Sequence, residues 1–319
     1  MAAAGHEPAG ERPCFLFRTP GVMTAKTFVL GVGAQKAGTT WLRAYLNDRF
    51  KCCDFGFAKE YQVWDSLHTE MHSGFEARDI LRARKYLETP GYRPLENKQF
   101  WRQFSFLVSP DSYFDYFAAL LLRPGEVRVT GDFTPSYMAL PLGVLQKIKE
   151  GFALRGIEVK VVFILRDPVE RNWSALRMAR HRKLFPADHP VLVRDEVSAL
   201  RHFATLDNSI QHTQYPGAIN RVLSVFGEER VFIDFYETFY REEGLRRLTD
   251  FLDLEYLAPD FGAKVKHLEK SGELPLEVRW RIARQFRLVY EGIADRYGAD
   301  FVSSIWSGYS LSQDPDKFS

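Results

Sequence analysis

The stretch GVGAQKAGTTW, residues 31–41, decides the fold because it joins a strand pattern to a helix pattern through a glycine-containing turn. Before it, Thr27–Gly33 is a short β-branched and apolar run, typical of a buried parallel strand. After it, apolar side chains recur at helical spacing from Trp41 to Leu46. Strand, turn and helix in this order direct backbone N–H groups and a helix N-terminus at one point, which predicts a phosphate-binding site.

This turn departs from a triphosphate-binding loop at one position. Gly33 and Gly38 have the spacing of such a loop, and Thr40 stands where it carries Ser or Thr. The position of its lysine is taken by Thr39, and the lysine lies inside the turn at Lys36. A lysine there suits transfer of a sulfuryl group, in which charge develops on the bridging oxygen of a leaving phosphate. The alternative is a plain glycine turn with a surface lysine.

Strand and helix patterns alternate along the rest of the chain. Strands are predicted at Glu126–Phe133, Val159–Leu165 and Arg230–Tyr236. Helices are predicted at Tyr113–Leu122, Pro141–Phe152, Pro168–His181, Ser209–Phe226, Glu237–Leu252 and Pro275–Tyr297. Two stretches, Glu88–Pro110 and Phe185–Val193, are predicted as loops that contact substrate. The prediction is an α/β protein with a three-layer P-loop-like fold, a central parallel sheet flanked by helices.

Length and composition bound the class of protein. The chain of 319 residues is expected to form a single domain over residues 25–319, preceded by a disordered extension over 1–24. That extension lacks a basic start and a sustained apolar run, so it does not read as a signal peptide, and Met23 could be the native start. We find no apolar stretch long enough for a membrane helix in the sequence and expect a soluble, cytoplasmic protein.

Charge and cysteine usage agree with that expectation. The net charge of +2 predicts no general surface for nucleic acid. Two runs of arginine could shape a local surface for a polyanion, although we favour solvated helix faces: Arg177, Arg180 and Arg182, and Arg279, Arg281 and Arg284. The three cysteines, Cys14, Cys52 and Cys53, have no spacing typical of disulfides, which favours a reducing compartment.

A second motif, LRDPVERNWSALRMARHR at residues 165–182, begins where a buried strand ends. Arg166 therefore emerges at the carboxyl edge of the sheet, where open α/β folds bind ligands. Pro168 opens a helix on which Ser174 can face the same edge. An arginine fork and a hydroxyl at this edge predict a site for a second phosphate. In the alternative, Arg166 pairs with Asp167 or Asp132 and Ser174 is an ordinary helix residue.

Together, GAQKAGTTWL and ILRDPVERNWS resemble the paired nucleotide-binding motifs of sulfotransferases that use 3′-phosphoadenosine 5′-phosphosulfate. Three further stretches look like the bacterial and carbohydrate, heparan-sulfate-type branch of that family: GDFTPSYM at 131–138, FGEERVFIDFYETF at 226–239 and HLEKSGELP at 267–275. The resemblance therefore extends over most of the chain.

The resemblance implies how the donor is held. The residues implied to wrap the 5′-phosphosulfate are Gln35, Lys36, Ala37, Gly38, Thr39, Thr40 and Trp41, with Lys36 over the bridging oxygen. Arg166 and Ser174 would hold the 3′-phosphate. Lys270 is a further candidate contact to the donor, whereas Lys266 is interpreted as a surface lysine. The product is 3′-phosphoadenosine 5′-phosphate, and in this family no metal is needed.

The resemblance also implies a catalytic base. AKEYQVWD, residues 58–65, looks like the Lys-Glu-x-x-x-x-Asp element of the heparan-sulfate-type enzymes, in which the Glu deprotonates the acceptor. Glu60 is the predicted base, and Lys59 and Asp65 are predicted to support it or to bind substrate. Two exposed charges are the alternative. Histidines at 68, 72, 181 and 189 are backup bases, and the first two have a spacing that could bind a metal.

One position departs from that branch. The branch commonly carries Glu-Lys before Thr-Pro, whereas this chain has Asp132 and Phe133, so a cation on the substrate side is missing. Asp132 remains a candidate substrate contact, but a highly sulfated polysaccharide becomes a less secure acceptor. The small-molecule branch uses a His base and a C-terminal Arg-Lys-Gly motif, and neither is evident in the sequence.

The sequence thus predicts a cytoplasmic sulfotransferase that acts on a hydroxyl, or an amine, of a small-molecule or carbohydrate acceptor, with no nucleic-acid or membrane partner. Two other functions stay open. One is a small-molecule kinase with a P-loop, against which the missing lysine at Thr39 counts. The other is a non-catalytic nucleotide-binding protein on the same fold, for which Phe133 is the one indication.

Overall fold

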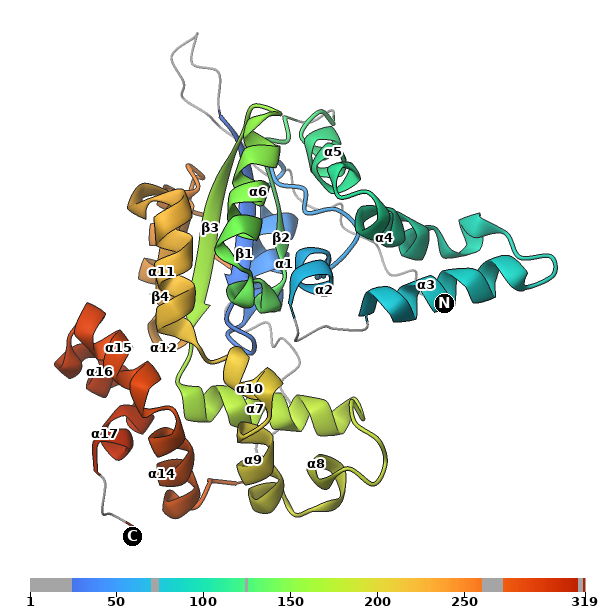
Figure 1. The fold of residues 1–319 in the computed structure, drawn as a ribbon. Coiled ribbons are helices and arrows are strands. Elements are labelled where there is room, and N and C mark those ends of the chain that lie inside the picture. The colour runs from blue at the N-terminus through green and yellow to red at the C-terminus, as the bar shows by residue number, and fades with distance from the viewer. Residues whose placement is uncertain (1–24, 70–74, 124–125, 260–271, 315–317, 319) are drawn as a thin grey trace, which may run out of the picture.

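The computed structural model describes residues 25–69, 75–123, 126–259, 272–314 and 318 (Figure 1). Within those residues the centre is a sheet of four parallel strands in the order β2-β1-β3-β4. The strands are β1 (Lys26–Gly33), β2 (Val129–Phe133), β3 (Ile157–Leu165) and β4 (Val231–Phe235). All four strands were predicted from their apolar runs, within a few residues at their ends.

The helices and helical turns of the described residues follow one another along the chain. Before β2 they are α1 (Thr39–Arg49), α2 (Trp64–His68), α3 (Phe75–Glu88), η2 (Pro94–Asn97), α4 (Lys98–Val108) and α5 (Asp111–Leu120). Between β2 and β4 they are η3 (Pro135–Ala139), α6 (Leu142–Ala153), α7 (Pro168–His181), α8 (Pro190–Val193), α9 (Glu196–Ala204), α10 (Asp207–Gln211), α11 (Tyr215–Phe226) and η4 (Glu228–Arg230). After β4 they are α12 (Tyr236–Phe239), α13 (Glu242–Phe251), α14 (Leu276–Gln285), α15 (Arg287–Tyr297), α16 (Ala299–Ile305) and α17 (Ser307–Gln313).

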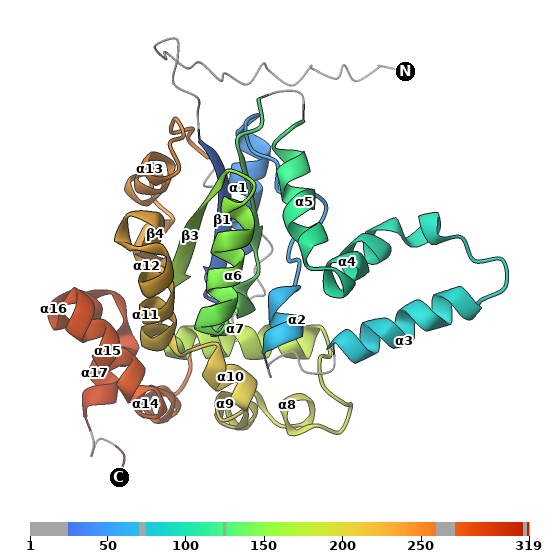
Figure 2. The same cartoon turned by 45° about the horizontal axis from the view of Figure 1, so that its top comes forward.

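Helices cover both faces of the sheet and confirm the predicted three-layer α/β fold. Figures 1 and 2 show α6 and α11 against one face and α1 against the other. The two central strands, β1 and β3, are almost wholly buried because their side chains meet helices on both sides. Phe28 of β1, for example, stacks on Phe152 of α6 with ring centroids 3.9 Å apart.

The connections between strands place a crevice at one edge of the sheet. From β1 the chain crosses to β2 on one side, and from β3 it crosses to β4 on the other, so the order reverses between β1 and β3. Ligands of open α/β sheets bind beyond the carboxyl ends of the strands at such a reversal. The turn after Gly33 and the side chain of Arg166 both lie there, which makes this edge the first candidate for the site.

Several helix predictions need correction. Residues 88–110 were predicted as a loop, but α4 occupies Lys98–Val108, and α4 and α3 form an arm that projects from the sheet (Figure 2). The predicted loop at Phe185–Val193 contains the short α8. The predicted helix Pro275–Tyr297 is divided at Phe286 into α14 and α15. The turn-forming residues Pro90, Gly91 and Pro94 favour a loop, but they all precede α4, which contains no Gly or Pro.

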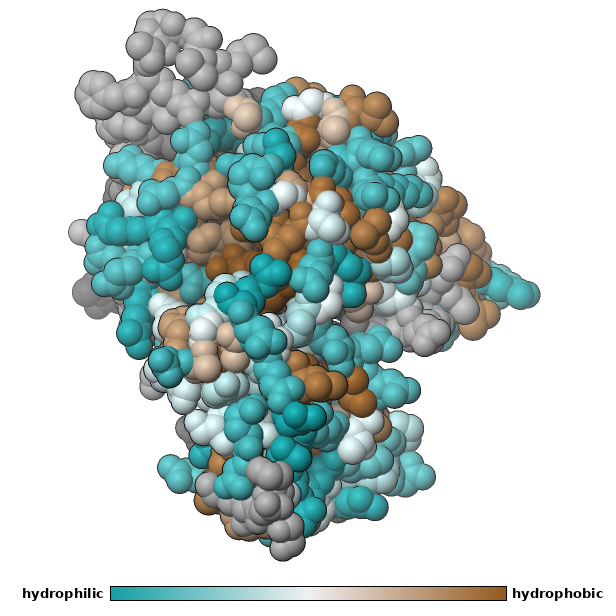
Figure 3. Space-filling model, turned by 60° about the vertical axis from the view of Figure 1, so that its left-hand side comes forward, coloured by the Kyte–Doolittle hydropathy of each residue, from teal (hydrophilic) through white to brown (hydrophobic). Residues whose placement is uncertain are grey.

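In the part of the chain that the structure describes, no helix is long and apolar enough to cross a membrane. The face drawn in Figure 3 is mostly covered by hydrophilic residues, with hydrophobic ones in smaller groups between them. The thiols of Cys52 and Cys53 are buried and not joined in a disulfide.

Candidate active site

The turn between β1 and α1 has a backbone that glycine makes possible. Gly38 has a φ of 78°, in the left-handed region, and a Cβ there would lie 2.1 Å from the hydroxyl oxygen of Tyr240. Lys36 also lies in the left-handed region, with a φ of 68°. In the described structure no side chain caps the first turn of α1, so its N–H groups can serve a ligand.

Two side chains from other parts of the fold hold carbonyl oxygens of this turn. Arg166 Nη1, at the end of β3, donates to the carbonyl of Lys36 at 2.6 Å. Tyr240, just after α12, donates its hydroxyl to the carbonyl of Ala37 at 2.7 Å. Because both carbonyl oxygens accept hydrogen bonds from side chains of the protein, the backbone of the turn is held in one conformation, as a phosphate-binding loop requires.

The ammonium group of Lys36 lies among cations. Its Nζ is 3.6 Å from Met178 Sδ on α7. Burial, as the largest cause, and the nearby charges of Arg166, Lys59, Arg182 and Arg177 together lower the pKa of Lys36 to about 8. Cations that lie close together repel one another, and a bound anion offsets this repulsion. Such a group of cations therefore indicates an anion-binding site. This group of five residues is called the cation cluster below.

Arg166 has donor capacity to spare for such an anion. Its Cζ lies 4.4 Å from the centroid of the Tyr236 ring, which fixes the plane of the guanidinium. Its Nη2 is 3.9 Å from a carboxylate oxygen of Glu170, too far for a hydrogen bond. Among the described residues its buried Nε has no hydrogen-bond partner. An orphaned buried donor beside a cationic loop fits a phosphate ligand.

Ser174 faces the same region. It is half-buried on α7, four residues before Met178, and residues at this spacing share one face of a helix. Because Met178 contacts Lys36, Ser174 shares the helix face that meets the turn. The N-terminus of α7 is capped by Asp167, whose carboxylate accepts from the N–H of Val169 at 2.7 Å. The structure thus brings Arg166 and Ser174 to the edge where the turn lies.

Two residues of this site were not predicted from the sequence. Arg171 is fully buried, donates to Gln35 Oε1 at 3.2 Å and binds Ser209 of α10. Burial lowers its pKa to about 10. Tyr240 closes the turn from the other side and contacts the ring of Trp41 edge to face. The sequence signal for Arg171 was its place in the second motif, but its partners come together only in the folded chain.

The remaining donor candidates lie along the same turn. Ala37 and Thr39 are buried, Gln35 is half-buried, and Thr40 is exposed at the start of α1. Trp41 stacks on Tyr45 with ring centroids 5.4 Å apart. Lys266 and Lys270 lie outside the described residues, as does His72.

The predicted base lies beside the cation cluster. Lys59 and Glu60 form an ion pair, with Lys59 Nζ 3.0 Å from a carboxylate oxygen of Glu60. Lys59 in turn is close enough to Lys36 to lower its pKa. The side chain of Glu60 is partly exposed, at 29%, so it is open to a substrate. Folding therefore brings together Lys36, Lys59 and Glu60 from two separate stretches.

Asp65 and Asp132 do not suit the substrate-binding role predicted for them. Asp132 is fully buried and accepts hydrogen bonds from Tyr113 at 3.0 Å and from Tyr137 at 2.8 Å. Asp65 is also fully buried and accepts from the hydroxyl of Ser136. Burial raises the pKa of each carboxyl to about 6. Because side chains of the protein enclose both groups, neither is open to substrate: Asp132 joins β2 to α5 and η3, and Asp65 joins α2 to η3. The other role predicted for Asp65, support of Glu60, stays a prediction.

The arginine run at 177–182 also needs correction, since it is more than a solvated face. Arg177 lies over the ring of Trp173, with Cζ 4.7 Å from its centroid, and belongs to the cation cluster with Arg182. Arg180 has a structural role, because it donates to the carbonyl of Arg194 at 2.5 Å and holds the segment after α8.

The backup histidines that the structure describes have other surroundings. His68 stacks on Trp64 with centroids 6.2 Å apart, and burial lowers its pKa. His189 caps α8 by accepting from the N–H of Val191 at 3.2 Å. His181 is exposed at the end of α7. The described residues contain no group of three or more His, Cys, Asp or Glu side chains that could hold a metal ion.

Comparison with known proteins gives similarity at the level of structure. No family model matches the chain, and no curated protein matches it by sequence. A crystal structure of a sulfotransferase from Alicyclobacillus acidocaldarius matches with a TM-score of 0.51 and 17% identity, covering 91% of this chain and 100% of that one. The chain therefore has the fold of that protein.

Two further structures are similar at lower scores. The sulfotransferase domain from the Synechococcus olefin synthase has a TM-score of 0.42 and 13% identity, covering 84% of this chain and 97% of that one. A sulfotransferase from Mycobacterium avium has a TM-score of 0.40 and 15% identity, covering 92% of this chain and 78% of that one.

Proposed function

We propose that the chain is a sulfotransferase that moves a sulfuryl group from 3′-phosphoadenosine 5′-phosphosulfate to a hydroxyl, or an amine, of a small-molecule or carbohydrate acceptor. The observation that carries the proposal is that Arg166, with an unpartnered buried Nε, binds the turn of Lys36 at the reversal of strand order between β1 and β3. The fold shared with a sulfotransferase is consistent with it.

The residues present fit such a donor. The turn at 35–40 and the uncapped N-terminus of α1 offer N–H groups and the Lys36 ammonium to the 5′-phosphosulfate. Arg166, with its unpartnered Nε, and Ser174 are our candidates for the 3′-phosphate. The missing lysine at Thr39 is consistent with a donor that has no γ-phosphate.

The proposed reaction needs a cation and a base in one place. The acceptor oxygen forms a bond to sulfur while the bond between sulfur and the bridging oxygen breaks. Lys36 stabilises the negative charge that remains on that oxygen, and Glu60 takes the proton of the acceptor hydroxyl. The ion pair with Lys59 holds the carboxylate of Glu60 next to the cation cluster.

The location and the metal requirement are part of the same proposal. The buried thiols of Cys52 and Cys53 suit a reducing compartment, and we propose that the enzyme acts in the cytoplasm. We propose that transfer proceeds without a metal, since cations of the protein itself lie near enough to Lys36 to lower its pKa and could offset the charge of the donor.

Binding of the desulfated product tests the donor site. In calorimetric titrations without added metal, 3′-phosphoadenosine 5′-phosphate is expected to bind the wild-type protein. Arg166→Ala should weaken binding by about 30-fold or more, because removing one partner of a desolvated charge pair costs about 2 kcal/mol or more. Arg287→Ala is the matched control, since Arg287 lies on the surface of α15 in an ion pair with Glu291.

Three outcomes separate the possibilities. Loss of affinity in Arg166→Ala with an unchanged control supports the donor site. Equal affinities in all three proteins would place the nucleotide elsewhere. Absence of binding to the wild type, with tight binding of ATP and magnesium instead, would favour the kinase.

The depressed pKa of Lys36 predicts how binding depends on pH. Below about pH 8 the lysine is charged, and above it the lysine becomes neutral, so affinity for the product should fall between pH 7 and pH 9.5. A bound phosphate favours the charged form and raises this pKa again. At pH 8 the complex should therefore take up protons, seen as an enthalpy that depends on the ionisation enthalpy of the buffer. An affinity that stays constant over this range would show that Lys36 does not contact the anion.

A further inference from the structure

The segment that carries the proposed base has no helix or strand of its own. Residues 54–63, between the residue pair Cys52–Cys53 and α2, follow an irregular path, and Lys59 and Glu60 lie within it. This segment is called the base loop below. Its position relative to Lys36 must be fixed closely, because a displacement of about 1 Å can cost about 10²-fold in rate.

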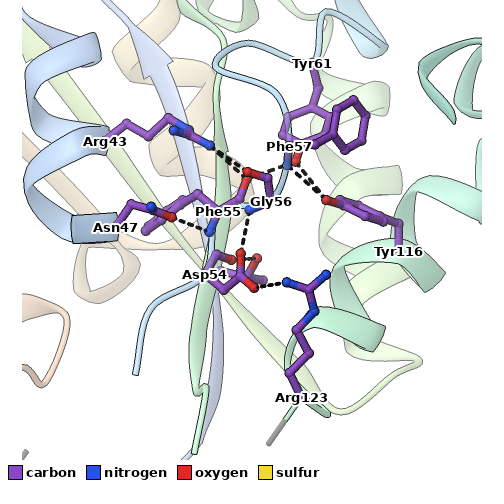
Figure 4. A network of polar contacts seen from close by, with 10 residues as sticks. Arg43, Asn47, Asp54, Phe55, Gly56, Phe57, Tyr61, Tyr116 and Arg123 are labelled. Carbon is purple, nitrogen blue, oxygen red and sulfur yellow. Dashed lines mark hydrogen bonds and ion pairs between the residues drawn. The ribbon is translucent and has the colours of Figure 1, made fainter. Parts of the chain in front are cut away.

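Two side chains of helix α1 form hydrogen bonds that fix the base loop. Arg43 Nη2 donates to the carbonyl of Gly56 at 3.0 Å and to that of Phe55 at 3.3 Å. Asn47, one turn further on, accepts from the N–H of Phe55 at 3.1 Å through Oδ1. Arg43 and Asn47 are four residues apart and share one face of α1, and both bind the base loop from that face (Figure 4).

Two tyrosines hold the opposite side of the same turn. Tyr61 donates its hydroxyl to the carbonyl of Phe55 at 2.9 Å, the oxygen that Arg43 also binds. Tyr116 of α5 accepts from the N–H of Phe57 at 3.2 Å. Gly56 has a φ of 67°, and a Cβ there would lie 2.1 Å from the Tyr116 hydroxyl oxygen, so the turn is closely enclosed.

The same helix thus connects the two halves of the site. The N-terminus of α1 follows the turn that carries Lys36, and the middle of α1 holds the carbonyls just before Lys59 and Glu60. We propose that Arg43 is a positioning residue that sets the base loop relative to the Lys36 turn. The inference rests on the proposed function, since it is Glu60 as base that makes this position matter.

The test compares three variants of α1. Arg43→Met keeps the length of the side chain and removes its donors, Arg43→Lys keeps one donor group, and Arg49→Met is the control, an exposed arginine on the same helix. Hydrogen exchange measured by mass spectrometry should show faster exchange of peptides within residues 54–63 in Arg43→Met. Exchange of peptides within residues 31–41 and affinity for 3′-phosphoadenosine 5′-phosphate should stay within about twofold of wild type.

Turnover adds a second readout that general destabilisation would not produce. With an acceptor found by screening, Arg43→Met should lower kcat by about 10²-fold with little change in KM for the donor, and Arg43→Lys should recover part of the loss. Unchanged exchange in 54–63, or equal loss in Arg49→Met, would overturn the positioning role. Failure of the wild type to bind the nucleotide would instead overturn the proposed function, while the exchange result on the base loop would still stand.

Discussion

Lys36→Ala is expected to lower kcat by about 10³-fold while weakening binding of 3′-phosphoadenosine 5′-phosphate far less. In the proposed reaction the charge of Lys36 acts on the bridging oxygen, where negative charge grows as the sulfur–oxygen bond breaks, and loss of one such donor costs about 10²- to 10³-fold in kcat. In the proposed complex the product would keep its contacts with Arg166 and with the N–H groups of α1. Turnover is measured as release of the desulfated nucleotide, and affinity by calorimetry.

The control for this variant is Lys51→Ala, an exposed lysine just after α1. It should match the wild type in both measurements. A Lys36→Ala protein that loses affinity as strongly as it loses kcat would mean that Lys36 binds the ground state and the transition state equally, contrary to its proposed role.

Glu60→Gln should lower kcat by about 10²- to 10⁴-fold, the range for removal of a general base, and leave product affinity unchanged. Glutamine has the size of glutamate but cannot take a proton from the acceptor hydroxyl at neutral pH. Because Glu60 lies beside Lys59 and not on the Lys36 turn, its replacement should leave the contacts to the nucleotide in place.

Two comparisons make this result specific. Glu291→Gln, on the surface of α15, is the matched control and should keep full activity. Lys59→Met should be less harmful than Glu60→Gln, since it removes the partner of the base and leaves the base itself. Full activity in Glu60→Gln would exclude it as the base.

The sheet could be predicted because its signals are local. A buried parallel strand is a continuous apolar run, and the runs that form β1 and β3 end directly in the turn and in Arg166. Their meeting at one edge follows from the rule that parallel strands place their carboxyl ends together. The helix α7 was likewise predicted from Pro168 to His181, because a proline opens it, whereas its cap by Asp167 is seen only in the structure.

Burial of polar residues could not be predicted in the same way. From the sequence, Asp132 and Asp65 were predicted to contact substrate. In the folded chain the hydroxyls of Tyr113 and Tyr137 bind Asp132, and the hydroxyl of Ser136 binds Asp65. Arg171 is the converse case, since an arginine in a helix is usually solvated, and here it is buried with partners on the turn after β1 and on α10.

The arm formed by α3 and α4 shows a different limit. Its aromatic residues pack largely on one another, as Phe100 does on Trp101 with centroids 5.3 Å apart, and this local packing needs no contact with the sheet. A prediction that looks for helices and strands packed into a central core therefore does not detect such an element.

The nucleotide half of the candidate site and the half that carries Glu60 are stabilised by different interactions. We therefore expect them to lose their structure at different temperatures. Lys36 and Arg166 follow the two central strands, whose backbone ladders are buried on both faces and are the last part of a fold to open. Glu60 sits in a loop that depends on a few side-chain hydrogen bonds, among them those of Arg43 and Tyr116. As temperature rises, the capacity for transfer should therefore fade while the nucleotide still binds, and inactivation should precede the collapse of the domain.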